Sequence, residues 1–307
     1  MSEEIAYGGL AVIEGVMIRS PRYWALACRL SSGDIDVHTE PVRGPLQRHP
    51  WVKKIPLVRG LCGLWELLIT AWKALERSGN LALEETGQQL GSGLMALNIV
   101  LALAIGLGLF IVAPNLLADF LKRWLGDHPL LLNLVEGLVR FALFLGYLWG
   151  VAQLPDIRRV FAYHGAEHKV VNAFEQGEAL TRENVRWHRT LHQRCGTTFV
   201  FLVLTLKIFA FALLPWTSEW YWRVLMRVAL VPLVVGVAFE LIYLTNKHRQ
   251  TRWAQVLVAP GLWMQRLTAQ EPTDDMLEVA LVAFHAARRA EETGELTCEV
   301  LPGQTAG

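Results

Sequence analysis

Residues 93–113 read GLMALNIVLALAIGLGLFIVA, and this stretch decides the class of protein. It lies within residues 86–118, a span that contains no charged side chain. A helix needs about 20 apolar residues to cross the roughly 30 Å of hydrocarbon in a bilayer. The whole chain has 307 residues, of which 53% are apolar, and a net charge of only +1. The stretch and the composition together predict an integral membrane protein.

Three further apolar runs follow the first. They cover residues 138–154, 195–216 and 227–246, and Lys207 and Glu240 interrupt the last two. Each run is long enough to span the bilayer if its tilt is small. The sequence therefore predicts a mainly α-helical polytopic membrane protein, with about four transmembrane helices and a small α+β cytoplasmic portion.

The distribution of basic residues predicts the orientation of the chain. Lys and Arg number ten between residues 19 and 77, seven between 158 and 194, and six between 247 and 289. Loops rich in these residues stay in the cytoplasm. We therefore expect a multi-pass protein with both termini cytoplasmic and without a cleavable signal peptide. The four cysteines are scattered, and we expect them to be reduced thiols.

The segments outside the membrane have their own organisation. Residues 1–55 contain β-prone runs, among them LAVIEGVMIRS, WALACRL and DIDVHTE, which predict a small cytoplasmic sheet. The two pairs of spans occupy 90–155 and 195–246, and the cytoplasmic segment 156–194 separates them. Residues 247–307 form a cytoplasmic tail in which DDMLEVALVAFHAARRAEE has helical periodicity, with acidic residues early and arginines late.

Residues 56–80 are predicted to form an amphipathic helix. Its polar and charged residues share one helical stripe, which consists of Arg59, Glu66, Thr70, Lys73 and Arg77. The remainder is apolar, as in a helix that lies in the membrane interface. A core helix of the cytoplasmic domain would show the same pattern, so both interpretations stay open.

The chemistry is concentrated in FAYHGAEHKVVNAFE, residues 161–175. His164 and His168 stand four residues apart, so on a helix they share one face, with Glu167 beside them. This is an H-x-x-E-H pattern, in which two imidazoles bind zinc and the carboxylate acts on the proton of a water molecule. A pattern of five residues also arises by chance, and the alternative is a hydrogen-bonded pair of histidines near the interface.

A second polar stretch, HRTLHQRCG, supplies further ligands. His188 and His192 stand four apart, and Cys195 follows at the start of the third predicted span. Zinc needs at least a third protein ligand, so His192 or Cys195 could complete a site with the first two histidines. Glu240, in the cytoplasmic half of the fourth span, could also reach that site, because an unpaired carboxylate there is costly. An ion pair with Lys207, or an orientation toward water, is the alternative for Glu240.

Several separate motifs resemble those of one known family. They are GGLAVIEGVMIRSP at 8–21, YHGAEHKVVNAFE at 163–175, HQRCGTTFVF at 192–201, FELIYL at 239–244 and PGLWMQRLTAQEPTDDMLEVA at 260–280. Through them the chain resembles a bacterial membrane family, domain of unknown function 1385, over roughly residues 8–290. Its members are described as predicted metal-dependent enzymes. The resemblance therefore implies such an enzyme in the bacterial inner membrane, and it names no substrate.

The resemblance also sorts the candidate residues. It implies site roles for residues of two motifs, namely His164, Glu167, His168, His192 and Cys195. His188 lies outside these motifs and becomes a weaker candidate. Glu14 lies in the IEGVM motif and is a further candidate, although a charge on a surface strand is the ordinary alternative.

The leading hypothesis is a cytoplasm-facing metal site at the membrane surface. His164 and His168 would hold a divalent metal, with zinc as the best match, together with His192 or Cys195 and with Glu240 as an optional ligand. Glu167 would act as general base on a metal-activated water, which makes the chain a hydrolase. The expected substrate is membrane-associated, either a lipid or a segment of a membrane protein.

Two other classes of function stay open. A non-enzymatic membrane scaffold would use the same residues as a closed structural metal site or as a hydrogen-bond network. A transporter is less well supported, because the sequence shows no inverted repeat. We expect no nucleic acid partner, since the basic residues follow the membrane flanks, and membrane lipids with anionic head groups are the better match. The sequence predicts no oligomeric state.

Overall fold

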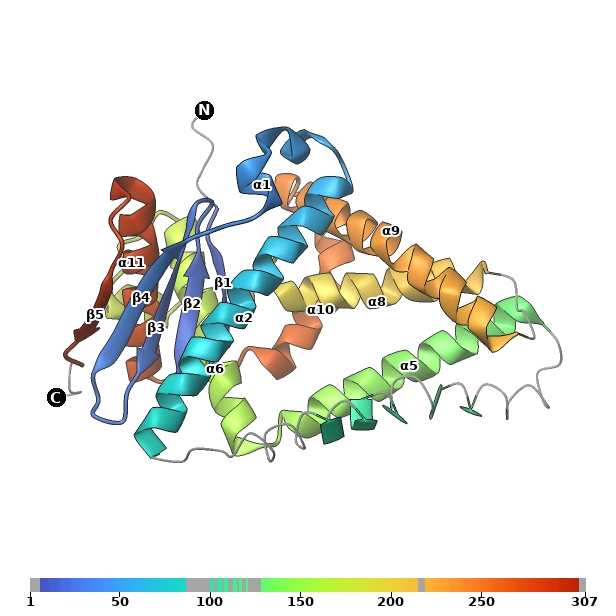
Figure 1. The fold of residues 1–307 in the computed structure, drawn as a ribbon, viewed down its shortest axis with the longest axis horizontal. Coiled ribbons are helices and arrows are strands. Elements are labelled where there is room, and N and C mark those ends of the chain that lie inside the picture. Colours follow the sequence, from blue (N-terminus) through green and yellow to red (C-terminus); the bar gives the residue numbers. More distant parts are fainter. Residues whose placement is uncertain are drawn as a thin grey trace.

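The computed structural model describes residues 6–86, 128–214 and 219–303, together with scattered positions between 100 and 120. Helices dominate it, and one five-stranded antiparallel sheet lies at one end (Figure 1). The predicted class, mainly helical with a small sheet, is confirmed at this level. The four cysteines are free thiols, as expected.

The sheet joins the two ends of the chain. Its strands are β1 (Gly8–Val12), β2 (Gly15–Arg19), β3 (Tyr23–Arg29), β4 (Ile35–Pro41) and β5 (Cys298–Leu301). They lie in sequence order, and every neighbouring pair is antiparallel. The N-terminal strands were predicted. β5 was not, because four residues, CEVL, are too few to show the alternation of a strand.

The helices follow in sequence order. They are α1 (Pro45–Arg48), the 3₁₀ helix η1 (Pro50–Lys54), α2 (Val58–Thr86), α5 (Pro129–Val151), α6 (Pro155–Glu175), α7 (Arg182–Arg186), α8 (Gly196–Ala212), α9 (Trp220–Lys247), α10 (Arg252–Thr268) and α11 (Asp274–Thr293). The helical part of the C-terminal tail therefore forms as α10 and α11. Asp274 and Asp275 lie in the first turn of α11, and Gly294 ends it with a φ of 78°.

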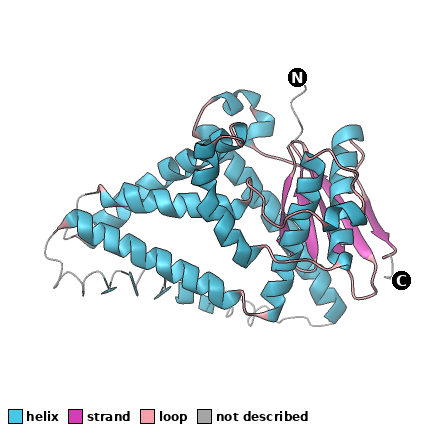
Figure 2. Ribbon diagram, turned by 180° about the vertical axis from the view of Figure 1, so that it is seen from behind, coloured by secondary structure: helices cyan, strands magenta, loops and turns pink. Residues whose placement is uncertain are grey.

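Helices cover both faces of the sheet. α6 and α11 pack on one face, and α2 crosses the other, as the front and back views show (Figures 1 and 2). Successive residues of a strand point to opposite faces. Val16 and Ile18 accordingly join the core under α6 and α11, whereas Met17 and Leu26 join a smaller core that includes Ala74 of α2.

α2 turns its polar stripe toward the protein and its apolar side outward. Glu66 and Thr70 are buried, whereas Trp65, Leu68 and Trp72 are 59%, 55% and 71% exposed. The exposed apolar side favours the interfacial interpretation, which stays a prediction, while Ala74 of the same helix packs in the smaller core. A large exposed apolar surface marks a site of contact with a membrane or another protein.

Two described helices are long and apolar enough to cross a membrane, over Leu130–Val151 in α5 and Leu225–Lys247 in α9. The prediction of four spans is thus supported for two. α8 has only 17 residues and is shorter than a usual span. The predicted span 93–113 lies largely outside the described residues.

α5 begins nine residues before the predicted boundary at 138. The predicted apolar run began at residue 138 and so left Glu136 outside the span, and a carboxylate inside a membrane helix is costly unless it is paired. In the structure Arg227 of α9 donates two hydrogen bonds of 2.7 Å to that carboxylate. The pairing lets the helix continue through Glu136.

Candidate metal centre

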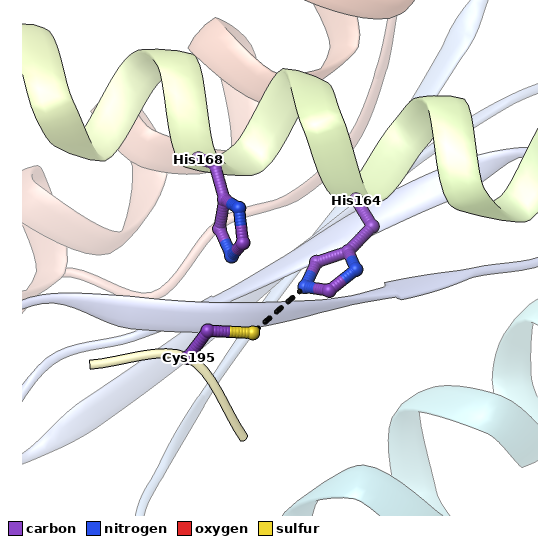
Figure 3. Close-up of side chains that lie close together, drawn as sticks. All are labelled: His164, His168 and Cys195. Atoms are coloured by element: carbon purple, nitrogen blue, oxygen red, sulfur yellow. Dashed lines mark hydrogen bonds between the residues drawn. The ribbon is translucent and has the colours of Figure 1, made fainter. Parts of the chain in front are cut away.

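Three potential metal ligands from two elements converge on one point. His164 and His168 project from the same face of α6, and Cys195 lies at the start of α8 (Figure 3). The His164 Nε2 atom is 3.2 Å from the Cys195 Sγ atom, and the two imidazole centroids are 4.3 Å apart. One ligand atom from each residue lies within 4.8 Å of the other two. Such a group can hold one metal ion.

Backbone carbonyls fix the orientation of both imidazoles. The Nδ1 atom of His164 is 2.7 Å from the Thr268 carbonyl oxygen, and the Nδ1 atom of His168 is 2.5 Å from that of Thr190. A carbonyl oxygen only accepts, so each Nδ1 carries a hydrogen, and in the neutral imidazole the lone pair is then on Nε2. Metal-bound histidines usually hold their second nitrogen in this way.

Cys195 caps the N-terminus of α8. Its sulfur accepts a hydrogen bond of 3.4 Å from the Thr197 amide and lies 3.1 Å from the Thr197 hydroxyl oxygen. The residue is 7% exposed. These contacts hold the sulfur at the N-terminus of α8, on the side of the two histidines.

Glu167 lies beside the three ligands and is buried. Its Oε2 atom is 3.5 Å from the Nε2 atom of His168. Burial raises the pKa of the Glu167 carboxyl, opposed by the neighbouring His164 and His192 and by a hydrogen bond from the Gly9 backbone. Burial likewise lowers the pKa of His168. Both side chains are almost completely shielded from solvent, with Glu167 2% and His168 1% exposed.

Gly9 of β1 makes room for Glu167. A Cβ atom at Gly9 would lie 2.2 Å from the Met17 carbonyl oxygen and 3.1 Å from Glu167 Cγ. Glycine alone permits this close approach of β1 to α6. In the sequence, the glycines of the run GGL at residues 8–10 were the sign of this close approach, and their role was not predicted.

His192 lies near the group and points elsewhere. Its ring centroid is 5.6 Å from that of His168, and its Nε2 atom is 3.1 Å from a Glu175 carboxylate oxygen. Burial opposes ionisation of Glu175, but the hydrogen bond with His192 and the charges of Arg194 and Arg249 hold the pKa of Glu175 below its usual value. Of the two predicted third ligands, the structure brings Cys195 to the histidines.

Glu240 is not brought to the metal ligands. It accepts hydrogen bonds from the Arg59 guanidinium, at 2.8 Å to Nε, and from the Leu57 amide at 3.1 Å. Glu240 therefore forms an ion pair, as the alternative prediction proposed, but its partner is Arg59 of α2 and not Lys207. Arg59 became available because α2 packs against α9.

The remaining two predicted candidates lie apart from the group. Glu14 occupies the turn between β1 and β2 with a φ of 50°, and it accepts hydrogen bonds from Arg159 at 2.7 Å and from Tyr163 at 3.2 Å. His188 lies 3.0 Å from a Glu178 oxygen. Both residues therefore have partners outside the three-ligand group.

Gln265 of α10 holds the loop that leads into the site. Its side chain accepts from the His192 amide at 2.9 Å and donates to the His192 carbonyl at 2.8 Å and to the Thr198 hydroxyl at 2.7 Å. It is completely buried. This residue was missed in the sequence because a lone glutamine in a helix carries no distinctive pattern.

A cleft of about 540 Å³ borders the site. It lies between β1, α2, α8 and α9, and Cys195 forms part of its wall. Apolar side chains line much of it, namely Leu10, Leu64, Leu67, Phe199, Phe239 and Ile242. Arg19 and Arg194 add two basic groups, each paired with a glutamate. The cleft can take an apolar chain that carries a polar or anionic group.

Two comparisons with known proteins found similarity. A family described as "Protein of unknown function (DUF1385)" matches residues 55–290. The Uncharacterized protein YqhQ of Bacillus subtilis (strain 168) is 37% identical over 304 residues, which cover 94% of each chain. No solved structure matches. The family match contains the three converging ligands and begins after residues 8–21, whereas the similarity to the Bacillus subtilis protein covers 94% of the chain.

Proposed function

We propose a function for this chain, which belongs to the DUF1385 family of proteins of unknown function, from the geometry of its own residues. It is a metal-dependent hydrolase whose site consists of His164, His168 and Cys195, with Glu167 as the general base. The observation that carries this proposal is the orientation of the two histidines, whose Nδ1 atoms face backbone carbonyls and whose Nε2 atoms are left for a ligand.

The donor set fits zinc. Two imidazole nitrogens and one thiolate are ligands that zinc commonly takes in proteins. Three protein ligands leave a fourth position open, as in catalytic sites. A zinc ion held there would supply Lewis acidity and lower the pKa of a water molecule in the open position.

Glu167 is placed to move the proton. It stands one residue before His168 on α6, and its carboxylate is 3.5 Å from the His168 Nε2 atom that would face the metal. A carboxylate with a raised pKa in a dry pocket is suited to accept a proton from water and to pass it to a leaving group. His164, His168 and Cys195 hold the reaction centre in place, and Thr190 and Thr268 fix the two rings.

We further propose that the chain spans the bacterial inner membrane, with four transmembrane helices and both termini in the cytoplasm. The two long apolar helices α5 and α9 support this placement, as does the concentration of basic residues outside the apolar runs. The outward apolar side of α2, with Trp65 and Trp72, would then lie in the cytoplasmic interface. The site would face the cytoplasm at the membrane surface.

The substrate proposed for this site is a membrane-associated amphiphile. The cleft is lined by residues of α2 and α9 as well as by Cys195, and its wall is largely apolar. A lipid could enter sideways from the bilayer and present its polar bond to the site. A segment of a membrane protein is the second substrate class that fits such a route.

The activity is tested by lipid analysis of a bacterium that lacks its own copy of the protein. Mass spectrometry compares cells that produce the wild type, E167Q or no protein. We expect one membrane component to accumulate equally in the E167Q and empty cells and to disappear with the wild type. Identical profiles in all three strains would contradict a hydrolase that acts on lipid.

A structural metal site in a membrane scaffold is the second candidate, favoured by the closeness of His192 to His168. A turn of His192 away from Glu175 would supply a fourth protein ligand and close the site. X-ray absorption at the zinc edge separates the two candidates. The hydrolase predicts two nitrogens, one sulfur and one oxygen around zinc, and retention of the metal in H192A. Three nitrogens and one sulfur, with metal lost in H192A, would establish the scaffold.

A further inference from the structure

A second cluster of charged side chains lies far from the metal ligands, where α5, α8 and α9 pack together. We call it the buried charge cluster, and it consists of Glu136, Arg140, Lys207 and Arg227. Glu136 and Arg140 stand one turn apart on α5, and the other two come from α8 and α9. Figure 1 shows these three helices extending away from the sheet.

Glu136 is shared by two arginines. Arg227 donates to both of its carboxylate oxygens at 2.7 Å, and an Arg140 nitrogen lies 2.5 Å from Oε1. Arg227 also donates to the Asn133 side-chain oxygen at 3.0 Å. Glu136 is only 2% exposed. The single carboxylate therefore has its hydrogen-bonding capacity filled by guanidinium groups.

The cluster has more positive than negative charge. Three cations surround one anion, which leaves a surplus of two positive charges among the described residues. Lys207 makes no hydrogen bond or ion pair with any described residue, and its ammonium lies 5.6 Å from the Phe211 ring centroid. The Nε atom of Arg140 is buried and also lacks a described hydrogen-bond partner. Two cationic groups thus have donors to spare.

The helices around this cluster present an apolar outer surface. Leu138 of α5, Val200 of α8 and Val228 of α9 are exposed on it. Charge in such surroundings is costly unless an opposite charge lies close by. Ionisable residues inside membrane helices accordingly mark functional sites. A negative partner for the surplus charge is the simplest way to stabilise this arrangement.

A small cavity opens between the same residues. Its volume is about 30 Å³, and its lining includes all four charged side chains, Asn133 and Phe211. A cavity of this size holds a group about as large as one or two water molecules. It is too small for a lipid head group or for a folded-in side chain from another protein.

We propose that the buried charge cluster binds one small inorganic anion, chloride or a similar halide, between Lys207 and Arg140. The ammonium and the free Nε–H of the guanidinium would both donate to it, and Arg227 would remain paired with Glu136. The bound anion would reduce the surplus charge and tie α8 to α5. This inference rests on the proposed membrane placement of the helices and is independent of the metal centre.

The test is thermal unfolding of the detergent-purified full chain, followed by tryptophan fluorescence. Sodium gluconate is replaced stepwise by sodium chloride at constant ionic strength and pH. A ligand that binds only the folded state raises Tm in a saturable manner, here by roughly 2–4 °C. We expect this rise in the wild type and its loss in K207Q. The control is K73Q, which removes an exposed lysine of α2 that pairs with Glu40 and should keep the full rise.

Two results would overturn the proposal, namely a wild-type Tm that does not depend on chloride or an equal chloride dependence in K207Q. A second test does not depend on the folding of K207Q. Crystals of the wild type are soaked in bromide, and the anomalous scattering of bromide is measured. An anomalous peak in the cavity beside Lys207 supports the site, and its absence contradicts it. Zinc content is measured on the same samples, so a failure of the metal centre is distinguished from a failure of the anion site.

Discussion

At the scale of residues, two backbone carbonyls decide what the histidines can do. Thr190 and Thr268 each hold one Nδ1 atom, and this leaves both Nε2 atoms toward Cys195. The rings would otherwise be free to rotate and to present either nitrogen. The positions of these carbonyls depend on the loop before α8 and on the end of α10, which are far from the H-x-x-E-H motif in sequence.

Gly9 is the residue whose replacement tests the packing behind the general base. In G9A the new methyl group would meet the Met17 carbonyl and the side chain of Glu167. Overpacking of this kind typically costs about 1–3 kcal/mol. We expect a corresponding fall in the denaturant concentration at the midpoint of unfolding.

Gly8 provides the matched control for that substitution. A Cβ atom there meets nothing within 4 Å, so G8A should leave the midpoint unchanged. Equal midpoints for G8A and G9A would show that β1 and α6 are not packed as closely as described.

At the scale of elements, α2 reverses the usual arrangement of an amphipathic helix. Its charged residues pair with the protein, Glu66 with Arg19 and Arg77 with Asp36, while its tryptophans face outward. A soluble protein would bury the tryptophans. The arrangement would be stable if the outer side met hydrocarbon, as in the membrane placement proposed above.

Quenching by brominated lipids tests the position of α2. The wild type and W72F are each reconstituted in vesicles that contain the quencher. The quenched fraction of tryptophan fluorescence should be smaller in W72F, because Trp72 is 71% exposed on the outer side. W24F removes a tryptophan that is 2% exposed beneath α2, and it should not reduce the quenched fraction. If W72F and W24F behaved alike, α2 would not lie against lipid.

The contact of α11 with the sheet predicts a dependence on pH. Glu291 of α11 accepts hydrogen bonds from the Ser20 hydroxyl at 2.7 Å and from the Arg22 side chain at 2.7 Å. Burial opposes ionisation of Glu291, but these bonds hold its pKa below the usual value. Its stabilising contribution is therefore present above about pH 4.3 and is lost as the pH falls through the lower folded-state pKa.

Comparison of the wild type with E291Q measures this contribution. The wild type should have the higher Tm at pH 7, and the difference should shrink as the pH falls below about 4.3. E292Q alters the neighbouring, 53% exposed glutamate and should show little difference at any pH. A difference between the wild type and E291Q that grows in acid would contradict the assigned hydrogen bonds.

At the scale of the whole molecule, the candidate metal centre lies where two parts of the chain join. α6 packs on the sheet, whereas Cys195 begins α8, which runs away from the sheet toward α5 and α9 (Figure 1). A metal bound between them would fasten the two parts to each other. The adjoining cleft lies along the same junction, so substrate access and the chemical groups are found together.

Local periodicity in the sequence accounts for what could be predicted. A spacing of four residues placed His164 and His168 on one helical face, and the position of Cys195 at the start of an apolar run brought it near them. The choice between His192 and Cys195 could not be made, because it depends on Glu175, which lies 17 residues earlier and binds His192. The early start of α5 was missed because it depends on a distant partner of Glu136, namely Arg227, and β5 was missed because its four residues are too few to show the alternation of a strand.

The central claim is that His164, His168 and Cys195 hold one metal ion, and elemental analysis of the purified chain tests it most directly. We expect one zinc per wild-type chain, its loss in H164A and C195A, and its retention in E167Q. H188A and C62A are the controls, since these two residues lie outside the three-ligand group, and they should keep the metal. A wild-type protein without metal after purification and zinc titration, or equal zinc in H164A and H188A, would contradict the account.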